Sequence, residues 1–213
     1  MRNTIQCLAT ALLIASPLAF AQSWEIGGLA GGGYFTNATV KSPVGSGNVG
    51  FKPGPSFGAI VGSNMNRYIS GELRYEWQPG DLKVSGSGGE ATFNGDGHAI
   101  HYDFLLHARP TRSKIRPFVA AGGGVKIYRG TGKETAAQAL SRLALLTKTT
   151  ETKGMISVGA GVKTQIAPGL VLRVEFRDFI TPFPRQVIAP SVGASISGWV
   201  HDFVPLAALT FVF

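Results

Sequence analysis

Cysteine, long hydrophobic stretches and charged residues are all scarce in this sequence of 213 residues. Its single cysteine, Cys7, lies in an apolar segment close to the N-terminus, so the rest of the chain cannot form a disulfide. Beyond that segment, no stretch is apolar for the roughly 18 residues that a membrane-spanning helix needs. These absences exclude a disulfide-stapled domain and a helical membrane protein. If the chain crosses a membrane, it must do so as β-strands.

The first 21 residues have the pattern of a secretory signal peptide. Arg2 precedes a charge-free apolar run over residues 5–15, Pro17 ends that run, and Ala19 and Ala21 provide small residues at the spacing of a cleavage site. The run is too short to cross the roughly 30 Å of hydrocarbon in a bilayer. We therefore expect export and cleavage after Ala21, which leaves a mature domain without cysteine.

The mature part, residues 22–213, alternates between apolar and polar positions in eight segments, as β-strands do. Each segment is near the roughly 9 to 11 residues of a tilted transmembrane strand. The predicted strands are residues 24–35, 55–63, 67–77, 98–109, 116–128, 155–166, 169–179 and 203–213. The connections alternate between long ones, at 36–54, 78–97, 129–154 and 180–202, and tight turns. This pattern predicts an all-β fold, an eight-stranded antiparallel up-and-down transmembrane barrel with four long extracellular loops and short periplasmic turns.

The two faces of the predicted strands differ in charge. One face carries no ion, as at Leu73, Phe104, Val158 and Leu172, and we assign it to lipid. The other face must fill the barrel centre, because eight strands enclose side chains and no open lumen. Ions there must pair, since a desolvated and unpaired charge costs several kcal/mol. Besides Glu25, the predicted interior ionic network contains Glu72, Arg74, Glu76, His101, Asp103, His107, Arg109, Lys126, Lys163, Arg173, Glu175 and Arg177.

A secreted lipocalin-like barrel would show the same alternation with the opposite sidedness, apolar inside and polar outside. Three features favour the membrane version: the alternating loop lengths, a final strand that ends at Phe213, and aromatic residues near strand ends. Trp24, Tyr34, Tyr75 and Trp77 have the placement of an aromatic girdle. The glycine runs at 31–33 and 122–124 are expected to make room for large inward side chains.

The formal net charge of +8 would suit a nucleic-acid partner, but an exported chain does not meet one, and we expect none. Instead, basic residues of the long loops are expected to contact lipopolysaccharide or acidic surface polymers. These residues are Lys133, Arg142, Lys148, Lys153 and Arg185.

Nucleotide-binding motifs are matched only superficially. Gly45 to Gly50 fits G-x-G-x-x-G, but Pro53 follows closely and no helix can open there to meet a pyrophosphate. Residues 130–134 lack the first glycine and the hydroxyl residue of a P-loop. We expect no cofactor.

Histidines offer weak candidates for a metal or catalytic site. His101 and Asp103 share one strand face about 7 Å apart, but a buried ionic network explains them better than a metal does, and we expect no metal. His201 and Asp202, together with the loop serines Ser191, Ser195 and Ser197, are the only candidate constellation for lipid chemistry. Sequence proximity is its sole support.

A helical spacing of apolar residues interrupts the β pattern within residues 136–147. Ala136, Ala139, Leu140, Leu143 and Leu146 recur at intervals that would share one helix face. The segment is therefore either a short helix in the third long loop or a compact loop.

The closing residues 206–213, with Leu209, Phe211 and the terminal Phe213, resemble the signal that the barrel-assembly machinery reads. The stretch from Arg116 to Val125 is similar to the fifth strand of small outer-membrane barrels, where an Arg-Pro-aromatic step precedes small residues. On these residues the mature chain resembles the OmpA/OmpX type of barrel, without its peptidoglycan-binding domain. The resemblance implies an outer-membrane location, contact with outer-membrane lipid and lipopolysaccharide, and buried ion pairs.

The fold is compatible with several activities. We expect a non-enzymatic surface protein whose exposed loops have a structural or binding role. A lipid A-modifying enzyme is the alternative, and a narrow channel is disfavoured because the barrel has no aqueous lumen.

Overall fold

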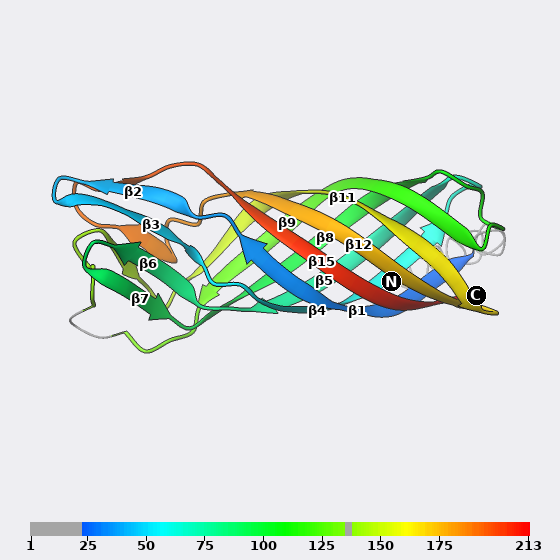
Figure 1. Cartoon of the computed structure of the whole chain (residues 1–213), viewed down its shortest axis with the longest axis horizontal. Coiled ribbons are helices and arrows are strands. Elements are labelled where there is room, and N and C mark those ends of the chain that lie inside the picture. The colour runs from blue at the N-terminus through cyan, green and yellow to red at the C-terminus, as the bar shows by residue number, and fades with distance from the viewer. Residues whose placement is uncertain (1–22, 135–137) are drawn as a thin grey trace, which may run out of the picture.

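The computed structural model describes residues 23–134 and 138–213, and its main feature is a closed antiparallel barrel of eight strands (Figure 1). Around the barrel the strands follow the order β1-β15-β12-β11-β9-β8-β5-β4, so β1 pairs with both β4 and β15 and no edge is left open. The barrel strands are β1 (Trp24–Phe35), β4 (Gly54–Asn64), β5 (Ile69–Pro79), β8 (Gly95–His107), β9 (Ile115–Gly130), β11 (Thr150–Ala167), β12 (Leu170–Pro182) and β15 (Trp199–Val212). The predicted fold class and strand number are confirmed. The predicted signal peptide, including Ala19 and Ala21, lies outside the described residues.

Strand ends differ from the prediction in a systematic way. Most barrel strands extend past their predicted ends on the side of the long connections: β11 begins at Thr150 and β15 at Trp199. At the opposite end β5 begins later than predicted, because Asn66 accepts backbone hydrogen bonds from Tyr68 and Ile69 and closes a turn. The added residues continue the pairing of adjacent barrel strands, as Thr150 does with Arg129 and Trp199 with Pro182.

The outward face of the barrel is apolar. The side chains assigned to lipid are exposed on it, with Leu73 at 52%, Phe104 at 55%, Val158 at 38% and Leu172 at 39%. Glu72, one residue away from Leu73, is 2% exposed. This alternation follows from the period of two along a strand. None of the described residues forms a helix long and apolar enough to cross a membrane.

Inward-facing glycines sit against the largest interior side chains. A Cβ atom on Gly122 would lie 2.3 Å from the carboxylate of Asp103, and one on Gly159 would lie 2.5 Å from the side chain of Arg177. Both distances are far below a van der Waals contact. The glycine runs therefore leave space for the ionic interior, as expected.

The long connections form a second structure, which we call the cap (Figure 1, left). It consists of the residues that join the barrel strands at this end, and its strands form two small sheets, in the orders β14-β2-β3-β6-β7 and β10-β13. Val40, Leu82, Val84 and Ile188 are at most 1% exposed in its apolar core. The cap strands are β2 (Ala38–Ser42), β3 (Gly45–Phe51), β6 (Leu82–Gly86), β7 (Gly89–Phe93), β10 (Ala144–Leu146), β13 (Ile188–Pro190) and β14 (Ser195–Ile196). The sequence pattern did not predict this apolar cap core.

The helix considered for residues 136–147 is wrong where the structure describes the segment. Residues 139–143 form turns, Leu140 has a left-handed backbone with φ of 62°, and β10 follows. The Gln138 side chain pairs with the backbone of Leu146 through hydrogen bonds of 2.8 and 3.0 Å. Leu143 and Leu146 are buried in the cap core, so their spacing reflects burial in a compact loop.

Candidate functional site

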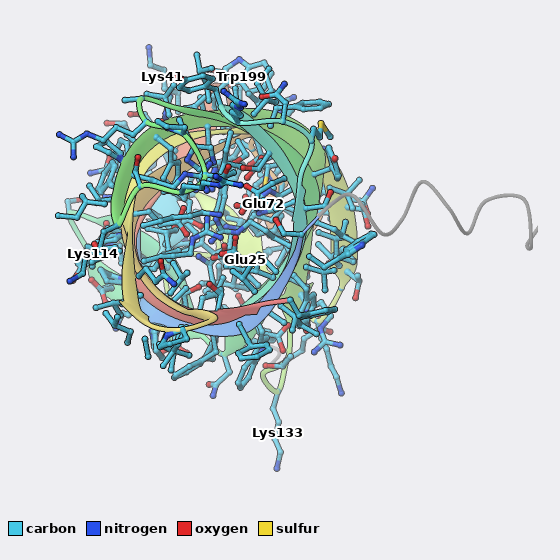
Figure 2. All side chains as sticks on the ribbon, turned by 90° about the vertical axis from the view of Figure 1, so that its right-hand side faces the viewer. Glu25, Lys41, Glu72, Lys114, Lys133 and Trp199 are labelled. Atoms are coloured by element: carbon cyan, nitrogen blue, oxygen red, sulfur yellow. The ribbon has the colours of Figure 1, made fainter. Side chains whose placement is uncertain are left out.

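Glu72 is the centre of the barrel's ionic interior. Its carboxylate accepts hydrogen bonds from Arg74 at 3.1 Å, Arg173 at 2.8 and 3.2 Å, and Arg177 at 2.9 Å. These arginines come from β5 and β12, which lie across the barrel from each other in the strand order. Figure 2 looks into the barrel along its axis, with Glu72 among the side chains that fill its centre.

Two further acids complete this central layer. Glu175 accepts from Arg74 at 3.0 Å and from Arg177 at 2.9 Å, and Asp103 accepts from Arg177 at 2.7 Å. Glu151 is buried at the cap end of β11, where it pairs with Lys153 at 2.7 Å. Apart from Glu151, the buried ions of the barrel balance in number, six acidic and six basic. The acids are Glu25, Glu72, Glu76, Asp103, Glu175 and Asp202, and the bases are Arg74, Arg116, Lys126, Lys163, Arg173 and Arg177.

Further ion pairs lie at each end of the central layer, and Arg173 links Glu25 to that layer at 3.3 Å. Toward the short turns, Glu25 accepts from Lys163 at 2.6 Å and from Thr210 at 2.7 Å. Toward the cap, Lys126 donates to Asp202 and lies 4.9 Å from the ring centre of Phe35. Asp202 was not predicted to belong to the network, because the period-two pattern places the residue in a long connection. The strand begins at Trp199 instead, so Asp202 falls on an inward position.

His101 and His107 are buried within the barrel. His101 lies 3.1 Å from Asp103 and 3.9 Å from Glu76, and its ring packs edge-on against Phe179. His107 bonds to Ser70. Among residues 23–134 and 138–213, no three histidine, cysteine, aspartate or glutamate side chains are grouped as metal ligands would be.

Arg109 does not belong to the interior network, which corrects the prediction. The strand β8 ends at His107, and Arg109 lies exposed in the following turn. Arg109 would face the interior, as His107 does, only if β8 continued two residues further. Its backbone carbonyl is nevertheless near the buried Arg116, whose Nε lies 3.5 Å away.

The candidate constellation of His201, Asp202 and loop serines is not assembled. Consecutive residues of β15 point to opposite faces, so Asp202 is buried inside while His201 bonds to Asp178 at 2.8 Å on the outer side. Ser191 donates to the backbone of Ser141. The glycine motif that begins at Gly45 forms part of β3 and opens no helix.

A polar chain on the outer wall was not foreseen. Arg129 holds Asp96 through two hydrogen bonds of 2.7 and 2.6 Å, His98 lies 3.5 Å from Asp96, and His98 bonds to the Tyr75 hydroxyl at 2.8 Å. The four residues line a shallow groove together with Phe57, Gly58, Ala59 and Trp77. The sequence signal that could have revealed this polar chain is the pair of polar residues at alternate positions, Asp96 and His98, which precede an outward apolar run.

The exposed cap is basic. The four long connections hold nine lysines and arginines against five acids, once the buried Asp202 is set aside. Three of these bases are paired: Lys52 with Glu90, Arg129 with Asp96 and Lys153 with Glu151. Nine bases and five acids give the four connections a net charge of +4. Among the unpaired bases, Lys133, Arg142 and Lys148 are exposed on the third connection.

A closed barrel with an apolar outer wall, aromatic residues near its strand ends and a self-neutralising centre defines a β-barrel membrane protein. A family model described as "Outer membrane protein beta-barrel domain" matches residues 6–185. The chain belongs to this family and is a protein of the bacterial outer membrane, with the cap outside the cell and the short turns in the periplasm. No curated protein matches the sequence.

Solved structures of small outer-membrane barrels share the fold. Neisserial surface protein A is 14% identical, with a TM-score of 0.52, over 90% of this chain and 97% of that chain. OprG from Pseudomonas aeruginosa is 11% identical, with a TM-score of 0.56, over 90% of this chain and 95% of that chain. At these identities the likeness establishes architecture alone.

Proposed function

We propose that the protein is a non-enzymatic outer-membrane protein whose cap binds lipopolysaccharide through its basic surface. The observation that carries the proposal is the uncompensated positive charge of the cap. Lys133, Arg142 and Lys148 form no ion pair among the described residues, and all three are exposed. Phosphate groups of lipopolysaccharide are anionic, so exposed cations attract them.

The wall groove supports the same proposal. The small outward side chain of Ala59 lies on its floor, Phe57 and Trp77 border it, and Arg129 lies at its rim with 43% of its side chain exposed. An acyl chain fits the apolar floor, and a phosphate above it meets Arg129. Lipid is the solvent on this face of the barrel, so a groove there is filled by lipid.

The test uses two matched triple variants in neutral detergent micelles. Lys133, Arg142 and Lys148 are changed to Gln in the first, and Arg67, Arg109 and Arg112, on the periplasmic turns, are changed to Gln in the second. Each exposed base near an anionic surface contributes about 1 kcal/mol, so the first triple should weaken lipopolysaccharide binding by about tenfold to a hundredfold at low salt. Binding by the wild type should also fall with rising salt. Equal affinities of the two triples would reject the proposal.

Lipid modification is a second candidate, favoured by one observation. The chain Asp96, His98 and Tyr75 sits in a lipid-facing groove and orients a histidine toward a hydroxyl. An acid, a histidine and a hydroxyl in series can pass a proton during acyl transfer. Mass spectra of lipid A from cells with the wild type, with His98→Gln and without the protein decide between the candidates. Identical spectra exclude lipid A modification, and a species lost in both altered strains supports it.

A further inference from the structure

At the periplasmic end the barrel interior opens into a hollow of about 250 Å³. Figure 2 looks into this end, where Lys114 lies on the rim. The polar lining includes Ser23, Asn64, Lys114, Arg116, Lys163 and Gln165. Six barrel strands and the turn between β8 and β9 contribute to it.

The charge of the lining is unbalanced. Its three bases are Lys114, Arg116 and Lys163, and its one acid is Glu25. The Glu25 oxygens already accept from Lys163, Thr210 and Arg173 at 2.6, 2.7 and 3.3 Å. This leaves Lys114 and Arg116 without a counterion in the hollow. The charged residues in the turns over residues 65–68 and 108–114 are all basic: Arg67, Arg109, Arg112 and Lys114.

Arg116 points to a ligand independently of this count. The residue is 7% exposed, and its Nη2 has no hydrogen-bond partner among residues 23–134 and 138–213. Its remaining contacts are long, 3.5 Å from Nε to the Arg109 carbonyl and 3.3 Å from Nη1 to Asn64. A buried guanidinium without a counterion is destabilising, and its planar fork matches the oxygens of a phosphate.

We propose that this hollow binds a phosphate group that enters from the periplasm. Arg116 holds two phosphate oxygens, Lys114 closes the open side, and Lys163 donates one of the ammonium hydrogens that Glu25 leaves free. The phosphate comes either from a soluble periplasmic compound or from the headgroup of an inner-leaflet phospholipid. Both sources present the same chemistry to these side chains.

Phosphate binding is measured by NMR on the full mature protein in maltoside micelles, with arginine side chains labelled and inorganic phosphate as the probe. Saturable shifts at Arg116 indicate a soluble ligand. Shifts in nanodiscs of phosphatidylglycerol or of phosphatidylcholine, relative to phosphate-free maltoside micelles, without shifts on addition of inorganic phosphate, indicate a lipid headgroup. Either pattern supports the site, and absence of a saturable shift under all three conditions overturns it.

Two variants and one matched control separate the site from general attraction. Arg116→Gln should weaken binding by about tenfold or more, because a charge-assisted hydrogen bond is lost. Lys114→Gln, on the exposed rim, should weaken binding without affecting folding. Arg112→Gln removes the same charge from the same turn, but Arg112 does not line the hollow, so its affinity should stay within about twofold of the wild type. An equal loss in Arg112→Gln and Lys114→Gln would show diffuse attraction and refute the site.

Discussion

Glu72→Gln is the sharpest perturbation of the barrel's interior. The side chain is 2% exposed and accepts hydrogen bonds from Arg74, Arg173 and Arg177. The substitution keeps the shape but removes one of six buried acids that balance six buried bases. Three guanidinium groups then face an amide whose own N–H groups cannot accept from them.

The expected loss in the free energy of unfolding is about 3 to 5 kcal/mol, the range for removing one partner of a buried ion pair. The four hydrogen bonds to Glu72 do not add separately, because Arg74 and Arg177 also bind Glu175 and Arg177 binds Asp103. Urea titration in phosphatidylcholine vesicles, followed by tryptophan fluorescence and by gel mobility without boiling, gives the shift in midpoint.

Glu90→Gln is the matched control. Its pair with Lys52 at 3.1 Å is exposed on the cap, with 45% of the Glu90 side chain accessible, and such pairs contribute at most about 1 kcal/mol. The double variant of Glu72→Gln and Arg173→Gln restores the balance of charge, so its loss should be smaller than the sum of the two single losses. If Glu72→Gln is no more destabilising than Glu90→Gln, the account of the interior is wrong.

Three further outcomes test other parts of the structure. Gly122→Ala places a methyl group 2.3 Å from the Asp103 carboxylate and should cost about 1 to 3 kcal/mol or more, whereas Gly154→Ala, at an outward position with no neighbouring atom within 4 Å, should be nearly neutral in the same urea titration. Leu82→Ala should destabilise the cap by about 2 to 5 kcal/mol, so limited proteolysis should cut the cap while the barrel fragment stays protected in the membrane. Planar-bilayer recordings should give no steady conductance, because side chains fill the barrel and the cap core covers one end; a stable open current would contradict this packing.

The barrel was predictable from the sequence because alternate residues of a strand face opposite sides of the wall, so the apolar and the charged residues of each strand fall on different faces. Residues such as Leu73 and Glu72 differ so strongly in polarity that their sides of the wall follow directly. Arg109 shows where this reasoning fails. The alternation of faces assigns a residue to the interior only within a strand, and no residue type in the sequence indicates that β8 ends at His107.

The cap was not predictable in the same way. Its strands are short, and Val40, Val84 and Ile188 are isolated among glycines and polar residues, so no local window reveals a shared core. They meet only because the barrel brings the four long connections to one end. Leu143 and Leu146 have the spacing of a helix face but lie in a compact loop, because a turn can also bury apolar residues at that spacing.

The two ends of the barrel are physically different, and this difference limits where function can reside. Above Lys126 and Asp202, the apolar cap core separates the ionic interior from the cell exterior. At the periplasmic end, Arg116 and Lys163 line an open hollow. A ligand outside the cell therefore meets only the cap surface and the upper wall, because reaching the central arginines from that side requires the cap core to unfold. The buried base that is least compensated, Arg116, lies instead at the periplasmic end.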